Sequence, residues 1–187
     1  MGEELFLEIH NLLFGLRRSI RYHNRRRSFF DGFQRFTNAV SITLGSAILF
    51  IILSDVGTYF AVTSAAIVTI FSAINLVASP SQKARLHEDL GRRFMMLERE
   101  LINREREDFT HEDLRRFTVQ RLEIEQEEPP TLYVLDAICH NELLRAMGYG
   151  KEYFVQVNWY QRLLANILDI RVDLIQPPAE RQKDQSW

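Results

Sequence analysis

FTNAVSITLGSAILFIILS (residues 36–54) and YFAVTSAAIVTIFSAINLVAS (residues 59–79) are two apolar stretches without a charged side chain. At a helical rise of about 1.5 Å per residue, each covers roughly 28–32 Å, which matches the hydrocarbon thickness of a bilayer. Residues 55–58 (DVGT) leave room only for a tight reversal. We therefore predict a two-span transmembrane helical hairpin over residues 36–79. The alternative, a buried hairpin of a soluble protein, is disfavoured because Asp55 is the only charge in this region.

The net charge and the cysteine count restrict the classes of partner and compartment. The net charge is −2, so no overall basic character points to a nucleic-acid partner. The chain has one cysteine, Cys139, which excludes an intramolecular disulfide and fits a reducing compartment. Leu135 and Leu143 share a helical face with it and predict a buried thiol, not a reactive one.

Basic residues flank the apolar stretches and are absent between them. Lys83 and Arg85 follow the second stretch, whereas residues 55–58 contain no lysine or arginine. The positive-inside rule therefore predicts that both termini are cytoplasmic. We interpret the arginines ahead of the first stretch as a topogenic, interfacial cluster; a site for nucleotide or lipid phosphate is the alternative. This arginine cluster consists of Arg17, Arg18, Arg21, Arg25, Arg26 and Arg27.

Helical periodicity extends to both sides of the hairpin. Apolar residues recur every three or four positions in 1–35, which predicts an amphipathic, basic cytoplasmic helix. Residues 80–170 show the same spacing between proline and glycine breaks and predict a cytoplasmic helical module. The polar tail 171–187 is predicted to be disordered. The predicted fold is all-α: a two-span transmembrane helical hairpin, 36–79, with a cytoplasmic helical bundle built from the N- and C-terminal helices.

Three features of the C-terminal module have specific interpretations. Thr110 and Asp113 have the spacing of a capping box, so we expect a helix to begin there. The acidic run Glu123–Glu128 is either a solvated helix end or a partner for the arginine cluster of the same or a neighbouring subunit. A heptad-like seam in the last predicted helix packs either inside the module or against another subunit. The seam residues are Tyr153, Val157, Tyr160, Leu164 and Ile167.

Small and polar side chains are frequent in both apolar stretches. In a bilayer, small residues let helices approach closely, and a side-chain amide needs a partner or water. Packing within the hairpin is one interpretation of these residues, and a pore is the other. Two helices cannot enclose a pore, so a pore requires a homo-oligomer of roughly four or more subunits. The pore-lining candidates are Ala65, Thr69, Ser72 and Asn75 of the second stretch and Asn38 of the first.

No combination of residues in the sequence points to catalysis. The chain has no GxGxxG motif, no Walker loop and no CxxC pair. Its five histidines lack the spacing of a metal site. We therefore expect no enzymatic activity, no cofactor and no metal.

The order of these features resembles the SLATT family, the two-transmembrane effector domains associated with nucleotide second messengers and SLOG-type sensors in bacteria. The resemblance is carried by RYHNRRR at Arg21–Arg27, by Ala84 and His87 after the hairpin, and by the acidic helix that runs into Glu128-Pro129-Pro130. It covers about residues 5–170. It implies a membrane effector of antiviral defence that oligomerises and permeabilises the bacterial inner membrane, causing abortive infection.

The trigger and two competing functions stay open at this point. The resemblance implies activation by a separate sensor protein or by a nucleotide second messenger. A non-conducting membrane scaffold that recruits a partner is one alternative. A holin-like phage membrane protein is the other, although the helical module after residue 80 is longer than a simple holin needs.

Overall fold

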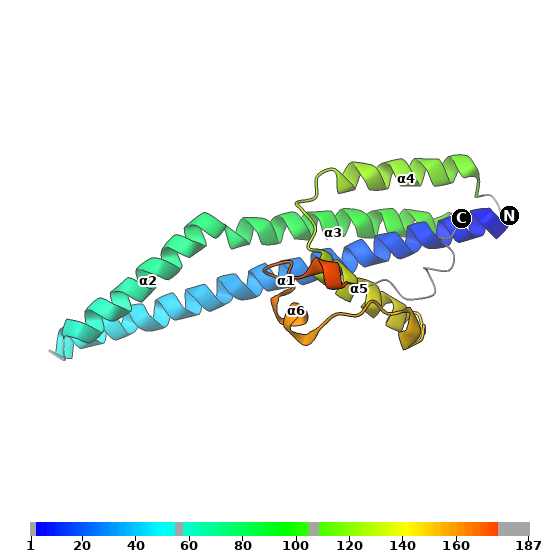
Figure 1. Cartoon of the computed structure of the whole chain (residues 1–187). Coiled ribbons are helices and arrows are strands. Elements are labelled where there is room, and N and C mark those ends of the chain that lie inside the picture. Colours follow the sequence, from blue (N-terminus) through cyan, green and yellow to red (C-terminus); the bar gives the residue numbers. More distant parts are fainter. Residues whose placement is uncertain (1–2, 55–57, 105–108, 176–187) are drawn as a thin grey trace. The chain divides into compact units, whose positions relative to one another are not determined.

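The computed structural model describes residues 3–54, 58–104 and 109–175. The described residues form helices and connecting loops, without a strand, so the predicted all-α class is confirmed (Figure 1). The elements are α1 (Glu3–Ser54), α2 (Thr58–Ala78), α3 (Pro80–Asn103), α4 (His111–Glu125), α5 (Tyr133–Ala146), α6 (Trp159–Leu164) and the short 3-10 helices η1 (Lys151–Tyr153) and η2 (Val172–Leu174).

The chain folds as two compact units. The first contains Met1–Arg25 and Glu88–Trp187, and the second contains Arg26–His87. Helices α1 and α3 contribute residues to both units. Helix α1 runs for 52 residues without a break at residue 36, because no proline interrupts it and its isolated glycines cost only about 1 kcal/mol each.

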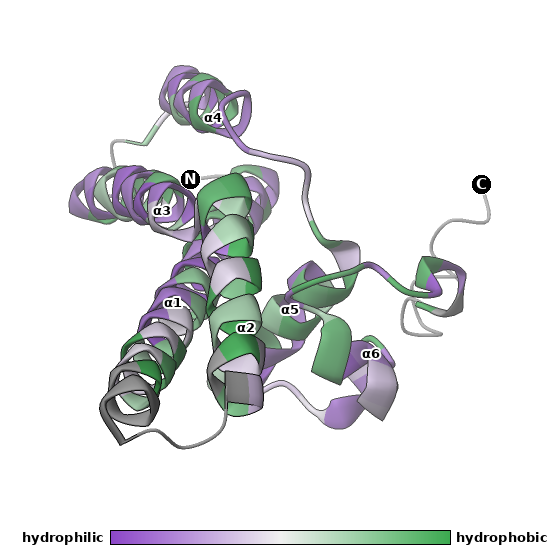
Figure 2. Ribbon diagram, turned by 90° about the vertical axis from the view of Figure 1, so that its left-hand side faces the viewer, coloured by the Kyte–Doolittle hydropathy of each residue, from purple (hydrophilic) through white to green (hydrophobic). Residues whose placement is uncertain are grey.

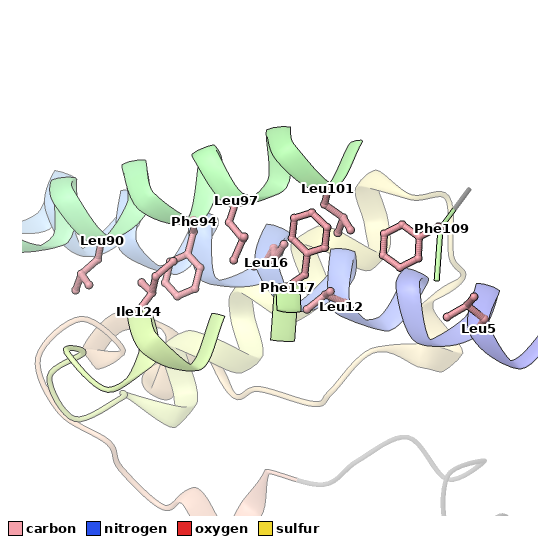
Figure 3. Packing of buried hydrophobic residues seen from close by; sticks show 10 residues of the cluster. All are labelled: Leu5, Leu12, Leu16, Leu90, Phe94, Leu97, Leu101, Phe109, Phe117 and Ile124. Atoms are coloured by element: carbon pink, nitrogen blue, oxygen red, sulfur yellow. The ribbon is translucent and has the colours of Figure 1, made fainter. Parts of the chain in front are cut away.

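The first unit contains an apolar cluster that joins α1, α3 and α4 (Figure 3). Phe94 of α3 and Phe117 of α4 are among its largest fully buried side chains. Burial of such a side chain contributes about 1.5–3 kcal/mol, so the ten buried members of this cluster contribute substantially to the stability of the unit. Its ten buried members are Leu5, Leu12, Leu16, Leu90, Phe94, Leu97, Leu101, Phe109, Phe117 and Ile124.

Helix α4 begins with the predicted capping box. The Thr110 hydroxyl accepts a hydrogen bond from the Asp113 backbone N–H at 3.2 Å, and the Asp113 carboxylate accepts one from the Thr110 backbone N–H at 3.1 Å. These two bonds satisfy donors that the first helical turn leaves unpaired. The Thr110 hydroxyl and backbone, followed by Arg104, hold the pKa of the Asp113 carboxyl below its usual range.

A second apolar cluster surrounds α5. The Tyr22 hydroxyl accepts a hydrogen bond from the Leu132 backbone N–H at 3.0 Å, which joins α1 to the start of α5. Cys139 is fully buried in this cluster, as predicted, and burial raises the pKa of its thiol to about 12. Asp169 accepts bonds from the backbone N–H groups of Tyr133 and Val134 at 2.8 and 3.1 Å, so a carboxylate caps the α5 N-terminus.

The heptad-like seam predicted over residues 153–167 is wrong as a continuous helix. Tyr153 ends η1, and α6 does not begin until Trp159. The Asn141 amide explains the break, because it bonds the backbone N–H and C=O of Val155 at 2.8 and 2.7 Å and holds this segment extended. The seam residues therefore belong to different local structures: Tyr153 lies in η1, Val157 in the extended link, Tyr160 and Leu164 in α6, and Ile167 beyond α6.

Parts of two predictions lie outside the described residues. The tight reversal between the apolar stretches falls mostly on residues 55–57. Most of the tail predicted to be disordered falls on residues 176–187, and its described beginning contains η2.

Candidate functional site

The second unit pairs α2 with the C-terminal part of α1. The rings of Phe36 in α1 and Phe71 in α2 meet edge-on, with their centroids 6.0 Å apart. Phe71 shares a helical face of α2 with three other half-buried residues, because they follow one another at steps of four, three and four positions: Ser64, Val68, Phe71 and Asn75. We call Ser64, Val68, Phe71 and Asn75 the packed face of α2.

A second face of α2 is apolar and exposed. Ile67, Ile70, Ile74 and Val77 follow one another at helical spacing, and all four side chains are exposed. Figure 2 shows α2 coloured as hydrophobic over most of its length. In the described part of the chain, one helical stretch, Val62–Asn103, contains a window long and apolar enough to cross a membrane, and none of that window is buried. We call these four residues the apolar face.

The third face of α2 carries small and polar residues. Ala65, Thr69 and Ser72 share this exposed face, which we call the small face. The Thr69 hydroxyl donates a hydrogen bond to the Ala65 carbonyl at 2.9 Å, so its proton is already satisfied within the helix. Three of the five pore-lining candidates therefore lie together.

The two asparagine candidates lie elsewhere. Asn75 belongs to the packed face, and its side-chain oxygen is buried and accepts no hydrogen bond from the described residues. Asn38 is exposed on α1, where its oxygen accepts a hydrogen bond from the Gln34 amide at 3.0 Å. Spacing along one helix could not place Asn75, because only the contact with α1 distinguishes the packed face from the small face.

Two arginines of the predicted cluster make ion pairs inside the first unit. The Arg17 Nε donates to the Glu98 carboxylate of α3 at 2.7 Å. The Arg18 Nε lies 3.2 Å from the Asp136 carboxylate of α5. The paired side chains keep between 20% and 34% of their surface exposed, so solvent screens each pair and its contribution is small, roughly 0–1 kcal/mol.

A third arginine extends this pattern. Arg25 makes a bidentate pair with Glu142 of α5, one bond of which joins Nε to Oε2 at 3.2 Å. Arg21 donates to the Arg17 carbonyl one turn earlier at 3.3 Å. The topogenic, interfacial interpretation of the arginine cluster did not include these tertiary contacts, since the partners lie far away in the sequence.

Arg26 and Arg27 belong to the second unit. The Arg26 guanidinium lies 4.6 Å from the centre of the Phe30 ring. Arg27 lies 3.6 Å from the Asp31 carboxylate one turn later. The cluster is thus divided between the two units, and these two residues flank the apolar part of α1.

The acidic run contacts both α1 and α3. The buried His23 ring stacks on Phe94 and places Nε2 3.0 Å from the Glu128 carboxylate. Arg93 donates two hydrogen bonds to Glu127, at 2.6 and 2.8 Å, and this pairing holds the pKa of the Glu127 carboxyl below its usual range. The run therefore joins helices of the first unit, and its Glu128 contacts the 17–27 segment through His23.

A cavity of about 480 Å³ opens beside Arg18 and Asp136. Burial raises the pKa of the Asp136 carboxyl, although the charge of Arg18 opposes the shift. Three carboxyl groups and one guanidinium line the cavity, so its charge does not favour a phosphate group. The lining residues are Arg18, Ser19, Tyr22, Glu125, Glu128, Pro130, Thr131, Tyr133 and Asp136.

The described residues hold no group of three or more His, Cys, Asp or Glu side chains arranged to bind a metal. His23 and His87 are buried and stack on Phe94 and Phe30 respectively, which is a packing role. No family model, curated protein or solved structure matches the chain.

Proposed function

We propose that this protein is a membrane effector that crosses the bacterial inner membrane twice, through residues 36–54 and 59–79, with both termini in the cytoplasm. In this proposal several copies assemble, and their hairpins form a pore that permeabilises the membrane during antiviral defence. The single observation that carries the proposal is the exposed apolar face of α2, a membrane-length helix with none of its most apolar window buried.

Helix α2 leaves large apolar side chains exposed, on the apolar face at Val77 and beside the small face at Leu76. Leu76 and Val77 are 81% and 86% exposed. Burial of a large apolar side chain contributes about 1.5–3 kcal/mol of stabilisation, which a side chain left in water lacks. Helix α2 presents several such side chains in succession. Lipid covers such a surface at no cost, whereas an isolated water-soluble chain has nothing to cover it with.

Two features of α2 support assembly. The small face, Ala65, Thr69 and Ser72, is exposed and carries two hydroxyl groups, so it can line a water-filled path between subunits. The buried Asn75 oxygen still lacks a donor among the described residues, and a water-filled path or a neighbouring helix can supply one. Because two helices cannot enclose a pore, the assembly contains roughly four or more copies.

The first unit is the proposed switch. Its ion pairs tie α1 to α3 and α5, and α1 and α3 also supply residues to the second unit. A signal that binds one arrangement of these helices more tightly than the other shifts the hairpins from closed to open. The resemblance to the SLATT family supports a defence role, with a separate sensor protein or a nucleotide second messenger as the signal.

The test is ion flux in bacteria that express the full chain from a tightly controlled promoter, alone and with its genomic neighbours. Membrane potential and dye influx are measured for the wild type, for Thr69→Leu/Ser72→Leu on the small face, and for Ile70→Leu/Ile74→Leu on the apolar face, at equal membrane abundance. We expect depolarisation by the wild type and the apolar-face control, and none by the small-face variant.

Two outcomes would contradict the proposal. Equal depolarisation by all three proteins would show that the small face does not line the path. No depolarisation by the wild type with its genomic neighbours present would favour the non-conducting scaffold instead.

A further inference from the structure

Arg26 and Lys83 both lie close to one aromatic ring, Phe30, in the second unit. The Arg26 guanidinium lies 4.6 Å, and the Lys83 ammonium 5.7 Å, from the centre of the Phe30 ring. Phe30 is buried and stacks on His87, with ring centroids 5.8 Å apart and planes inclined by 12°. Arg26 also lies 5.9 Å from the Phe29 ring. Two cations, one from α1 and one from α3, thus lie within about 6 Å of the centre of the same ring.

The charge around this pair is opposite in sign to that of the whole chain. The net charge of the protein is −2. The two segments that flank the hairpin, 26–35 and 80–89, contain three acidic residues, Asp31, Glu88 and Asp89, against five basic ones, and Asp31 lies 3.6 Å from Arg27. The basic residues of these segments are Arg26, Arg27, Arg35, Lys83 and Arg85.

The position of the pair along the helices matches the headgroup layer. Helix α2 ends at Ala78, Ser79 adopts a left-handed conformation (φ 43°), and α3 starts at Pro80. Within α3, Lys83 follows Pro80 by three residues, or about 4.5 Å of helical rise, which is within the thickness of one headgroup layer. The exposed Lys83 side chain can therefore reach a lipid phosphate while the apolar part of α2 stays in hydrocarbon.

We propose that Arg26 and Lys83 bind the phosphate of an anionic phospholipid headgroup, with Phe30 as the aromatic floor. This inference rests on the proposed membrane crossing. The guanidinium offers a planar pair of donors to phosphate oxygens, and the lysine adds a second, mobile charge. Basic residues beside an anionic leaflet contribute about 1 kcal/mol each, so the loss of both weakens lipid binding about thirtyfold.

The test uses the full chain purified in dodecyl maltoside. Native mass spectrometry counts bound dioctanoyl-phosphatidylglycerol, with dioctanoyl-phosphatidylcholine as the zwitterionic comparison and inorganic phosphate as a competitor. The variant is Arg26→Gln/Lys83→Gln, and the matched control, Arg115→Gln/Lys151→Gln, removes an exposed arginine and an exposed lysine from the first unit.

We expect the wild type and the control to prefer phosphatidylglycerol, and the Arg26→Gln/Lys83→Gln variant to bind it about thirtyfold more weakly. Lys83→Gln alone, which changes an exposed residue and leaves the Phe30 floor intact, should weaken binding about fivefold. Equal binding of the two lipids, an equal loss in the control, or displacement of the lipid by an equal concentration of inorganic phosphate would overturn the assignment.

A second measurement separates this inference from the proposed function. Proteoliposomes made of phosphatidylcholine alone are floated on a density gradient after alkaline extraction. Retention of the chain in these vesicles, together with no preference for phosphatidylglycerol, would refute the lipid site and leave the membrane crossing intact. Loss of the chain from the vesicles would refute the crossing itself.

Discussion

Replacing Ile70 by arginine distinguishes a membrane-spanning α2 from a water-exposed one. Ile70 is exposed on the apolar face, and it lies two residues from Val68, the midpoint of α2, or about 3 Å along the helix axis. At the centre of a spanning helix, arginine costs about 2.5–3.5 kcal/mol and isoleucine contributes about −0.3 to −0.6 kcal/mol. The substitution should therefore raise the insertion free energy by about 3–4 kcal/mol, or more than a hundredfold in the equilibrium.

The assay reports the side of the membrane on which the C-terminus lies. Alkaline phosphatase is fused to the C-terminus, where it is active only after export to the periplasm. With two spans, the wild-type fusion is inactive. If Ile70→Arg blocks the second span while the first still inserts, the C-terminus is exported and phosphatase activity rises.

The matched control is Met95→Arg, which adds the same charge at an exposed apolar residue of the polar helix α3. We expect this fusion to remain inactive. In water, either arginine substitution at an exposed position changes stability by no more than about 0.5 kcal/mol. Equal phosphatase activity for Ile70→Arg, Met95→Arg and the wild type would therefore refute the assignment of α2 as a span.

Three further predictions concern the first unit. Phe94→Ala should lower the free energy of unfolding by about 3–5 kcal/mol because the side chain is fully buried, as measured by denaturation of the detergent-solubilised chain; a loss below about 1 kcal/mol would contradict this core. Burial raises the pKa of Asp136 despite Arg18, so its charged form disfavours folding. The wild type should lose stability relative to Asp136→Asn as pH rises from about 4 through the folded-state pKa, and the reverse trend would contradict this sign. Cys139, with a thiol pKa of about 12, should resist iodoacetamide at pH 8 and react after denaturation, whereas rapid labelling of the native protein would show an accessible thiol.

Features that depend on neighbours in the sequence could be predicted from the sequence. The Thr110–Asp113 capping box was predicted from a three-residue spacing, because both hydrogen bonds form within one turn. Burial of Cys139 followed from its apolar neighbours on the same helical face. Leu90 and Phe94 of α3 lie four residues apart and enter the same apolar cluster, since helical periodicity fixes which side chains share a face.

Features that depend on distant partners could not be predicted. Arg25 meets Glu142 across 117 positions of sequence, and no local pattern selects that partner over any other carboxylate. The predicted seam failed because Asn141 bonds the backbone of Val155, which favours an extended segment over a continuous helix.

The sequence by itself determined the helical class and the two long stretches without charge, because both depend only on composition and periodicity. Only the tertiary structure decided which side of α2 packs on α1, and it thereby separated Asn75 from Ala65, Thr69 and Ser72. The physical reason is that a helix presents several equivalent stripes of side chains, and contact with a partner helix makes one of them the interior.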